Sequence, residues 1–467
     1  MFKVILLLIY IATILAVLFV ERKNPTEALL WVLVVICLPY VGLILYLIFG
    51  STAAIKLNSS LRRKRISKRL PPAKEPQNLL VSRQISETDQ QVILFNTNYN
   101  ETPLTCYDDY RFLTSGEAHY RALFQDIKEA KECIYVLFLT IHHDVMGEAL
   151  AKALAEKARQ GVKVLVMYDF LANFATPRKM FRDLEQAGGR VIRIKPYLTH
   201  YREHRKIVAI DHRIGYIGGM NIGKQYANLA EKKNPWRDTQ VRLTGACVTV
   251  LDAYFMTDLL CAVRQKDWEP MVRYMESIQL PRHNRTEHLC QFVVGGVDNT
   301  KESVKMNYLS MIRSAKRIIR IQSPYFIPDA SILDALKTAA ASGVQIELMI
   351  PGIKASFFLD PVTTYYAGQI MQYGARVYKY RGYIHAKTMT IDEEVCCIGS
   401  VNMDIRSLMV DDEICGVFYD NSLVEEYIRI FRQDIDSCDP YSYEEFNSRS
   451  SRERFMEEIF LPFAPLM

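Results

Sequence analysis

The chain lacks the residue spacings that mark metal sites in proteins. Its 10 cysteines form no CxxC pair or Cys/His cluster, and it contains neither an HExxH motif nor an acidic cluster. Scattered thiols in a chain of this length argue against a disulfide framework and indicate reduced cysteines, most of them packed as small apolar groups in a cytosolic compartment. We therefore expect chemistry that needs no metal ion or other cofactor.

A strong excess of one charge is also missing. The chain has 58 Lys and Arg residues against 52 Asp and Glu, and a formal charge of +6 is too small for 467 residues to indicate nucleic-acid binding by itself. Apolar residues make up 49% and charged residues 24%, which is typical of a globular protein. Single cores stop growing near roughly 250–300 residues, so we expect more than one core.

Two long uncharged runs open the chain, at residues 4–20 and 28–50. As helices they would be roughly 26 and 34 Å long, close to the bilayer core of about 30 Å. No small-x-small cleavage site follows the first run, which argues against a signal peptide. We predict a hairpin of two transmembrane helices within residues 1–50.

Basic residues follow the second run. Seven Lys and Arg side chains lie between residues 56 and 69, whereas the turn between the two runs balances its basic residues with glutamates. The positive-inside rule then places both termini and the main domain on the cytoplasmic side. The basic segment either contacts anionic lipid head groups or serves only as a solvated linker that sets topology. We assign residues 51–95 to a basic juxtamembrane linker.

The remainder of the chain has an α/β pattern that occurs twice. In the first copy, helical and dense apolar patterns alternate over 120–130, 134–139, 150–158, 162–170, 180–187 and 191–194, with Gly161 ending the second helix. The second copy follows the same order, with a strand at 318–322 and a helix at 332–340. We predict an α/β fold of two pseudo-symmetric halves, residues 96–285 and 286–467, each a mixed sheet flanked by helices.

Each half contains one copy of a polar motif. The two copies are about 180 positions apart and share their His, Lys, Asp and Asn at matching spacings: His204, Lys206, Asp211, Gly219 and Asn221 in the first, and His385, Lys387, Asp392, Ser400 and Asn402 in the second. On a strand, the His and Lys would leave on one face. The small residues let backbone approach a ligand closely.

Two such motifs facing each other would suit a phosphodiester. Ammonium groups would hold the phosphate oxygens, while one imidazole attacks the phosphorus and the other protonates the leaving alkoxide. The lysines supply the charge neutralisation that a metal ion would otherwise give.

Both copies match the HxKxxxxD signature, so the chain resembles the phospholipase D superfamily. The apolar N-terminus, the segments 235–239 and 323–329, and the order of parts are similar to bacterial cardiolipin synthases. This resemblance implies a two-step phosphatidyl transfer between two phosphatidylglycerols. The products are cardiolipin and glycerol, and the intermediate is a phosphatidyl-histidine. We expect an integral protein of the bacterial cytoplasmic membrane that acts on anionic lipid and binds no nucleic acid.

The resemblance also implies roles for individual residues. It makes His204 the nucleophile and His385 the general acid and then base, although the residues alone do not fix that order. It makes Lys206, Lys387, Asn221 and Asn402 ligands of the phosphoryl oxygens, beside Gly219 and Ser400. Asp238 and Glu413 would each orient an imidazole through its second nitrogen. Asp211 and Asp392 belong to the signature, and we expect them to brace the hairpin.

Other functions share this chemistry. Water could resolve the intermediate, which would make the protein a hydrolytic phospholipase D, and another head-group alcohol would make it a different phosphatidyltransferase. A nuclease is disfavoured by the apolar N-terminus and modest charge, and an inactive lipid-binding scaffold by the intact motifs.

Several further features have two readings. His142 to Asp144 could line the substrate site, whereas His200 and His212 are interpreted as incidental. The apolar segments Phe357 to Leu359 and Leu461 to Met467 are either buried anchors or segments that dip into a membrane.

Overall fold

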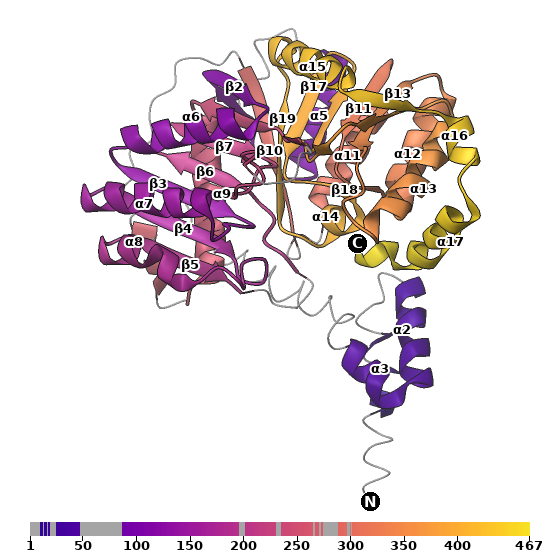
Figure 1. Ribbon diagram of the computed structural model, residues 1–467, viewed down its shortest axis with the longest axis horizontal. Coiled ribbons are helices and arrows are strands. Elements are labelled where there is room, and N and C mark those ends of the chain that lie inside the picture. The colour runs from indigo at the N-terminus through magenta and orange to yellow at the C-terminus, as the bar shows by residue number, and fades with distance from the viewer. Residues whose placement is uncertain are drawn as a thin grey trace, which may run out of the picture.

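The structure is a computed structural model. It describes residues 10–12, 14–15, 17–18, 25–46, 86–195, 201–229, 235–264, 267–269, 272–273, 288–296, 299 and 301–467. Figure 1 shows two α/β halves side by side, with the described N-terminal helices set apart from them.

The N-terminal region is described only in part. Helices α2 (Pro25–Cys37) and α3 (Pro39–Leu45) are separated at Leu38, and Pro39 occupies the first turn of α3. Among the described residues, no helix is both long enough and apolar enough to cross a bilayer. The predicted basic segment at residues 56–69 lies outside the described residues, as do most of the first predicted span and of the linker.

The first half is built on a seven-stranded sheet of order β2-β9-β7-β6-β3-β4-β5. Its strands are β2 (Asp109–Leu113), β3 (Cys133–Phe138), β4 (Lys163–Asp169), β5 (Arg190–Ile194), β6 (Ile207–Ile210), β7 (Ile214–Gly218) and β9 (Gln240–Thr244). Strands β3, β4 and β5 are parallel, while β6, β7 and β9 run antiparallel to their neighbours. The sheet is therefore mixed, as predicted.

The second half repeats this arrangement within a nine-stranded sheet of order β1-β10-β19-β17-β16-β11-β13-β14-β20. Its strands are β1 (Thr105–Tyr107), β10 (His288–Gly295), β11 (Ile318–Gln322), β13 (Gln345–Pro351), β14 (Arg376–Tyr380), β16 (Thr388–Ile391), β17 (Val395–Gly399), β19 (Glu413–Phe418) and β20 (Cys438–Tyr441). Strands β19, β17, β16, β11, β13 and β14 repeat the order and directions of β9, β7, β6, β3, β4 and β5. The predicted duplication is confirmed.

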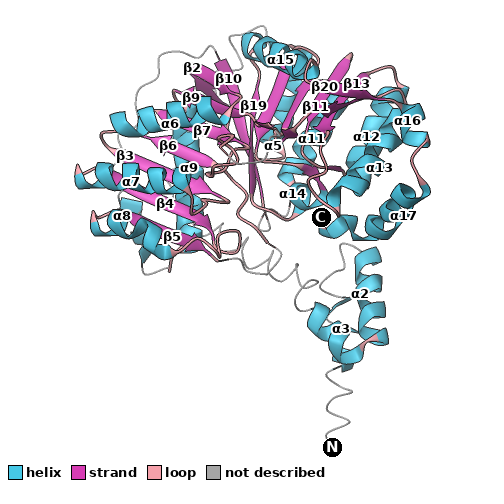
Figure 2. Ribbon diagram, in the orientation of Figure 1, coloured by secondary structure: helices cyan, strands magenta, loops and turns pink. Residues whose placement is uncertain are grey.

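Helices cover both faces of each sheet (Figure 2). In the first half they are α6 (Gly116–Glu129), α7 (Val145–Arg159), α8 (Arg182–Gln186) and α9 (Cys247–Ala262); in the second they are α11 (Ser303–Ser314), α12 (Ala330–Ala341), α13 (Leu359–Met371) and α15 (Asn421–Ile435). Local chemistry sets their ends. Asp144 caps α7 by accepting from the amides of Met146 and Gly147, and Gly161 follows at a φ of 89° that favours glycine.

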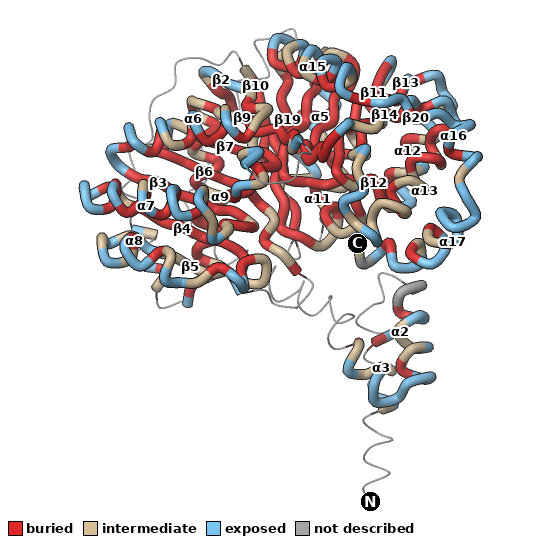
Figure 3. The backbone as a smooth tube through the Cα atoms, viewed as in Figure 1, coloured by how far each residue is buried: buried red, intermediate tan, exposed pale blue. Residues whose placement is uncertain are grey.

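The two halves share a hydrophobic core. Apolar residues of α9, including Leu251 and Phe255, form one buried cluster with β19 and α15 of the other half. The sheets meet where Ile217 of β7 packs against Gly416 of β19, a position that leaves no room for a Cβ. Burial is therefore continuous through the centre of the molecule (Figure 3).

The end of the predicted linker and the start of the predicted first half both pack with the second half. Helix α5 (Glu87–Asn98) packs on α11, where Asn96 donates to Asn307 at 2.9 Å, and β1 pairs with β10. The predicted boundary between residues 95 and 96 thus falls inside a helix whose contacts lie with residues 303–314. This crossing ties the start of the domain to its C-terminal part.

Candidate active site

The two His-x-Lys motifs meet at the boundary between the halves. Each lies just before a strand: residues 204–206 precede β6 and residues 385–387 precede β16. The prediction that these residues lie within a strand is therefore wrong by a few positions. Each segment instead forms backbone hydrogen bonds with the other half. His204 N donates to Asp412 O at 2.9 Å, and His385 N donates to Arg237 O at 2.6 Å.

His204 is held by a carboxylate of the second half. Its Nδ1 lies 2.7 Å from Oε1 of Glu413, which is fully buried, while the imidazole keeps 12% of its surface exposed. The second carboxylate oxygen of Glu413 accepts from the hydroxyl of Ser400. With Nδ1 occupied, Nε2 is the nitrogen left to face a substrate.

His385 is held in the mirror arrangement by the first half. Its Nδ1 lies 2.6 Å from Oδ2 of Asp238, and the side chain of Asp238 is fully buried. The other oxygen of Asp238 accepts from the amide of Thr239 at 2.7 Å. Each half thus supplies the carboxylate that orients the histidine of the other, which sequence spacing could not indicate.

The electrostatics of the two pairs differ. Burial, followed by the charge of Lys206, lowers the pKa of His204, and burial with the charge of Lys387 lowers that of His385 to about 3. Burial raises the pKa of Glu413 to about 7. For Asp238 burial acts in the same direction, but the charges of Lys387 and His385 outweigh it, so its pKa is lowered. Both imidazoles are neutral before substrate binds, and only Asp238 is firmly ionised.

The two lysines lie beside the histidines. Lys206 Nζ donates to the backbone carbonyl of His204 at 2.5 Å, and Lys387 Nζ donates to that of His385. Burial lowers the pKa of Lys206 to about 8 and that of Lys387 to about 7. A bound phosphate anion would stabilise these two buried ammonium groups, whose charges repel each other.

The two asparagines differ in their bonding. The side-chain oxygen of Asn221 accepts from the amide of Thr140 at 3.2 Å, and its nitrogen donates to the hydroxyl of Tyr226 at 2.9 Å. The buried Oδ1 of Asn402 has no hydrogen-bond partner among the described residues. Asn221 is therefore engaged in local structure, whereas the amide of Asn402 could bind a phosphoryl oxygen only through its nitrogen, since its oxygen can only accept.

Asp211 and Asp392 brace the hairpins. Asp211 accepts from the amides of residues 131–133 at 2.7 to 2.9 Å, and Asp392 accepts from those of residues 316–318 at 2.8 to 3.0 Å. Both adopt a left-handed backbone with φ of 51° directly after β6 and β16. These bonds fix the turn of each hairpin to the start of the neighbouring central strand.

The small residue at position 219 makes room for protein rather than for ligand. A Cβ on Gly219 would lie 2.2 Å from Oδ1 of Asp238, so a larger side chain would displace the carboxylate that holds His385. At the matching position of the second half, the Ser400 hydroxyl instead bonds Glu413.

Sequence reasoning missed a buried arginine inside the first motif. Arg205 is 1% exposed and forms ion pairs with Asp258 at 2.9 Å and Asp412 at 3.1 Å, and it donates to Gly295 O at 2.7 Å. The contacts with Asp412 and Gly295 cross to the second half, whereas Asp258 belongs to the first. The second motif has Ala386 at this position, and that asymmetry was the one available signal.

Aromatic rings surround only one of the two histidines among the described residues. Trp236, Tyr383 and Tyr226 place their ring centroids 5.1, 5.9 and 6.0 Å from that of His385. Trp236 and Tyr383 belong to β8 (Trp236–Arg237) and β15 (Tyr383–Ile384), which pair in parallel across the halves. These rings limit the access of water to the His385 side of the site.

The remaining candidate histidines have local partners. His142 Nε2 lies 2.8 Å from Gln225 Nε2, and His143 Nε2 lies 3.2 Å from a carboxylate oxygen of Glu148. His212 is bonded to Asp252, and His200 lies outside the described residues.

The described residues include no group of three or more His, Cys, Asp or Glu side chains placed to hold a metal ion. Independence from metal stays a prediction.

Comparison with known proteins agrees with this geometry. Residues 123–234 and 308–435 match the family described as "Cardiolipin synthase, PLD-like domain", and residues 8–51 match "Phospholipase_D-nuclease N-terminal". The major cardiolipin synthase ClsA of Bacillus subtilis is 32% identical over 495 residues, covering 100% of this chain and 99% of that one. The cardiolipin synthase of Listeria welshimeri is 32% identical over 481 residues, covering 99% and 98%.

A solved structure shares the fold. The phosphatidylserine synthase of Haemophilus influenzae superposes with a TM-score of 0.63 at 15% identity, covering 81% of this chain and 100% of that one. Since the family match includes both motifs and the relatives align along the whole chain, the protein belongs to the phospholipase D-like family of bacterial cardiolipin synthases.

Proposed function

We propose that this protein is a cardiolipin synthase that transfers a phosphatidyl group from one phosphatidylglycerol to another. The observation that carries the proposal is the crossed pairing of His204 with Glu413 and of His385 with Asp238 at the boundary of the halves. Both pairs leave Nε2 of a neutral imidazole available, and Lys206 and Lys387 flank them. A two-step displacement at a phosphodiester requires such groups: a nucleophile, a proton donor and cations that bind the phosphate.

In the first step, Nε2 of His204 attacks the phosphorus of a phosphatidylglycerol. The bond from phosphorus to the glycerol oxygen breaks, and that oxygen takes a proton from His385, so glycerol leaves and a phosphatidyl-histidine remains. Lys206, Lys387 and Asn402 bind the phosphoryl oxygens and stabilise the charge that develops on them. The incoming phosphate anion also favours the protonated form of His385 that this step requires.

In the second step, the terminal hydroxyl of another phosphatidylglycerol gives its proton to His385 and attacks the phosphorus. The bond to His204 breaks and cardiolipin leaves, so His204 is again neutral and His385 has regained the proton that it gave to glycerol in the first step. The order of roles rests on the carboxylates. Ionised Asp238 stabilises an imidazolium and suits the proton donor His385, whereas Glu413, with its raised pKa, suits a nucleophile that stays neutral.

The N-terminal region would place this site at a membrane. Residues 4–20 and 28–50 carry no charged side chain, and the match over residues 8–51 falls on this region. We infer an integral protein of the cytoplasmic membrane, with two spans, both termini and the catalytic halves on the cytoplasmic side, and residues 56–69 near anionic head groups.

The direct test uses purified protein and vesicles of phosphatidylglycerol labelled in the glycerol head group, with a metal chelator present. One free glycerol should appear for each cardiolipin formed, and His204→Ala and His385→Ala should each nearly abolish turnover. Glycerol released together with phosphatidic acid, and no cardiolipin, would contradict the proposal and identify a hydrolase.

A further inference from the structure

Apolar side chains project into solvent along one outer edge of the second half. Phe455, Ile459 and Phe463 follow at intervals of four along α17 (Ser451–Phe460) and η4 (Leu461–Leu466), and between 42% and 58% of each is exposed. Residues four apart on a helix lie on the same side. This stripe faces away from the core, because the neighbouring Phe460 and Ala464 are buried instead.

The loop before α13 adds two more rings to this edge. Phe357 and Phe358 are 66% and 56% exposed, so the interpretation of this segment as a buried anchor is wrong for both phenylalanines. Both pack edge-on against Phe460, with centroids 5.4 and 5.0 Å away. Loop and helix therefore form one surface, which we call the aromatic face: Phe357, Phe358, Phe455, Ile459 and Phe463.

Cationic side chains border the aromatic face. Arg452 lies three residues before Phe455 and hence on the same side of α17, and Lys354 lies three residues before Phe357. Both are exposed, and neither forms an ion pair with any carboxylate in the part of the chain that the structure describes. An apolar stripe bordered by unpaired cations is a composition found on surfaces that lie on anionic lipid, although the exposed Glu458, three residues after Phe455, also lies on this side of α17.

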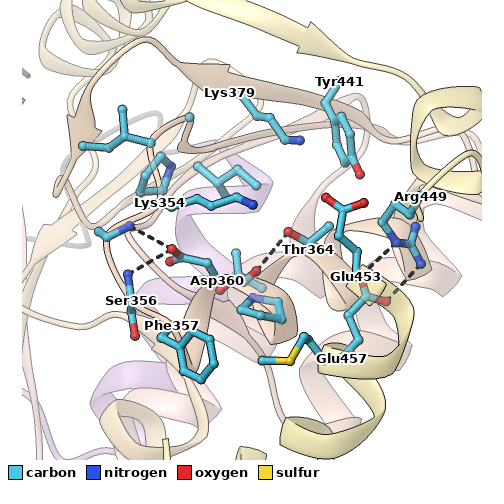
Figure 4. Close-up of a pocket in the computed structure, with 18 of the residues that line it drawn as sticks. Lys354, Ser356, Phe357, Asp360, Thr364, Lys379, Tyr441, Arg449, Glu453 and Glu457 are labelled. Carbon is cyan, nitrogen blue, oxygen red and sulfur yellow. Dashed lines mark hydrogen bonds and ion pairs between the residues drawn. The ribbon is translucent and has the colours of Figure 1, made fainter. Parts of the chain in front are cut away.

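A cavity of about 940 Å³ opens beside this face (Figure 4). Phe357, Lys354 and Arg452 are among the residues that line it, together with carboxylates already bonded to protein. The carboxylate of Asp360 accepts from two loop amides at 2.8 and 2.9 Å, and that of Glu457 pairs with Arg449 at 2.8 Å. Lys354 and Arg452 are thus charged side chains of the cavity that remain available to a ligand.

The inner wall of the cavity approaches the candidate active site. Pro324 lines the cavity, and the next residue, Tyr325, bonds its hydroxyl to that of Tyr383 at 2.9 Å. The ring of Tyr383 stacks beside His385. In this chain of contacts, the side chains of Tyr325 and Tyr383 stand between the cavity wall at Pro324 and His385.

The aromatic face also lies toward the N-terminal helices. In Figure 1, α17 and the C-terminus form the side of the domain nearest to α2 and α3. Those helices carry exposed apolar side chains of their own, including Leu29 and Ile44. In this view, exposed apolar side chains thus occur on the N-terminal helices and on the edge of the domain that points toward them.

We propose that the aromatic face is a second membrane contact, which docks the catalytic halves on an anionic bilayer and brings the cavity mouth to the lipid surface. This inference rests on the proposed function, because only an enzyme with a lipid substrate needs a path from the bilayer to His385. It predicts that exposed apolar residues far from the catalytic groups govern turnover on vesicles.

The first test compares Phe455→Ser/Ile459→Ser with the control Val145→Ser, whose side chain is 61% exposed on α7, in the other half. On phosphatidylglycerol vesicles the turnover of the Phe455→Ser/Ile459→Ser protein, the stripe variant, should fall about tenfold, and that of the control should not change. On short-chain phosphatidylglycerol below its micellar concentration both should match the unaltered protein. Unchanged turnover of the stripe variant on vesicles would overturn the proposal. An unaltered protein that makes cardiolipin from neither substrate form would instead refute the proposed function.

The second test does not depend on activity. A fluorophore at Phe455→Cys or Val145→Cys is placed in the Cys37→Ser variant of the full chain, because Cys37 is exposed. The protein is reconstituted in vesicles whose lipids carry a shallow nitroxide quencher. Quenching at position 455 well above that at position 145 is expected. Equal quenching at both positions, or a change of oligomeric mass in the stripe variant without such quenching, would show that the face has another occupant.

Discussion

The crossed pairing of carboxylates and histidines predicts that Asp238→Asn and Glu413→Gln fail at different steps. Asp238 lies in the first half but would serve His385, and Glu413 lies in the second half but would serve His204. Replacing either carboxylate by its amide keeps the size of the side chain and removes the charge. An amide can also donate to Nδ1, which would leave the proton on Nε2, where it blocks catalysis.

The expected loss follows from the bond that is altered. Asp238 Oδ2 lies 2.6 Å from His385 Nδ1 with the carboxylate fully buried, so no water can replace it. Removing general acid–base function costs about 10²- to 10⁴-fold in rate, which corresponds to about 2.7–5.4 kcal/mol in the barrier. We expect Asp238→Asn to lose turnover of phosphatidylglycerol within this range.

The assay that separates the two roles uses a phosphatidyl ester of p-nitrophenol. This leaving group needs no proton, so Asp238→Asn should still release a rapid burst of about one nitrophenol per enzyme and then turn over slowly. Glu413→Gln should lose the burst, because the attacking imidazole is the one affected. A burst in Glu413→Gln and none in Asp238→Asn would reverse the assignment of nucleophile and acid. Normal turnover in both variants would refute the reasoning altogether.

Three further predictions concern geometry, stability and metal. Gly219→Ala should lower turnover by about 10²-fold, because the added Cβ would lie 2.2 Å from the Asp238 carboxylate; Ser400→Ala, which only deletes a hydroxyl, should cost less in the same assay. Burial opposes the charge on His212, but the hydrogen bond to Asp252 at 2.8 Å raises the pKa of His212 to about 10. The protonated His212 therefore stabilises the fold fully below the unfolded pKa of about 6.5, and this stabilisation is lost as the pH rises toward 10. Urea unfolding should therefore show the difference in stability between the unaltered protein and His212→Gln shrinking from pH 7 to pH 10, and a constant difference would contradict it. Dialysis against a chelator should leave cardiolipin formation unchanged, and loss of activity that added divalent cation restores would contradict a metal-independent site.

Much of the architecture follows from the sequence, because local periodicity and local chemistry produce it. The buried strand predicted at 318–322 and the helix end at Gly161 match β11 and the end of α7. Dense apolar runs fit strands covered on both faces, and glycine is the residue that adopts the left-handed turn without strain. Duplication of the motif likewise predicted two halves with one sheet order, since equal patterns at equal spacing fold in the same way.

The candidate site itself required the tertiary structure. The sequence by itself determined which residue types are present, namely two histidines, two lysines and two asparagines at repeated spacings. Tertiary structure decided which carboxylate meets which histidine, that buried Arg205 pairs with Asp412 of the other half, and that the phenylalanines at 357 and 358 face solvent. The two histidine–carboxylate contacts join residues 147 and 209 positions apart. They depend on how the halves pack through their shared core, and no local pattern of residues encodes that packing.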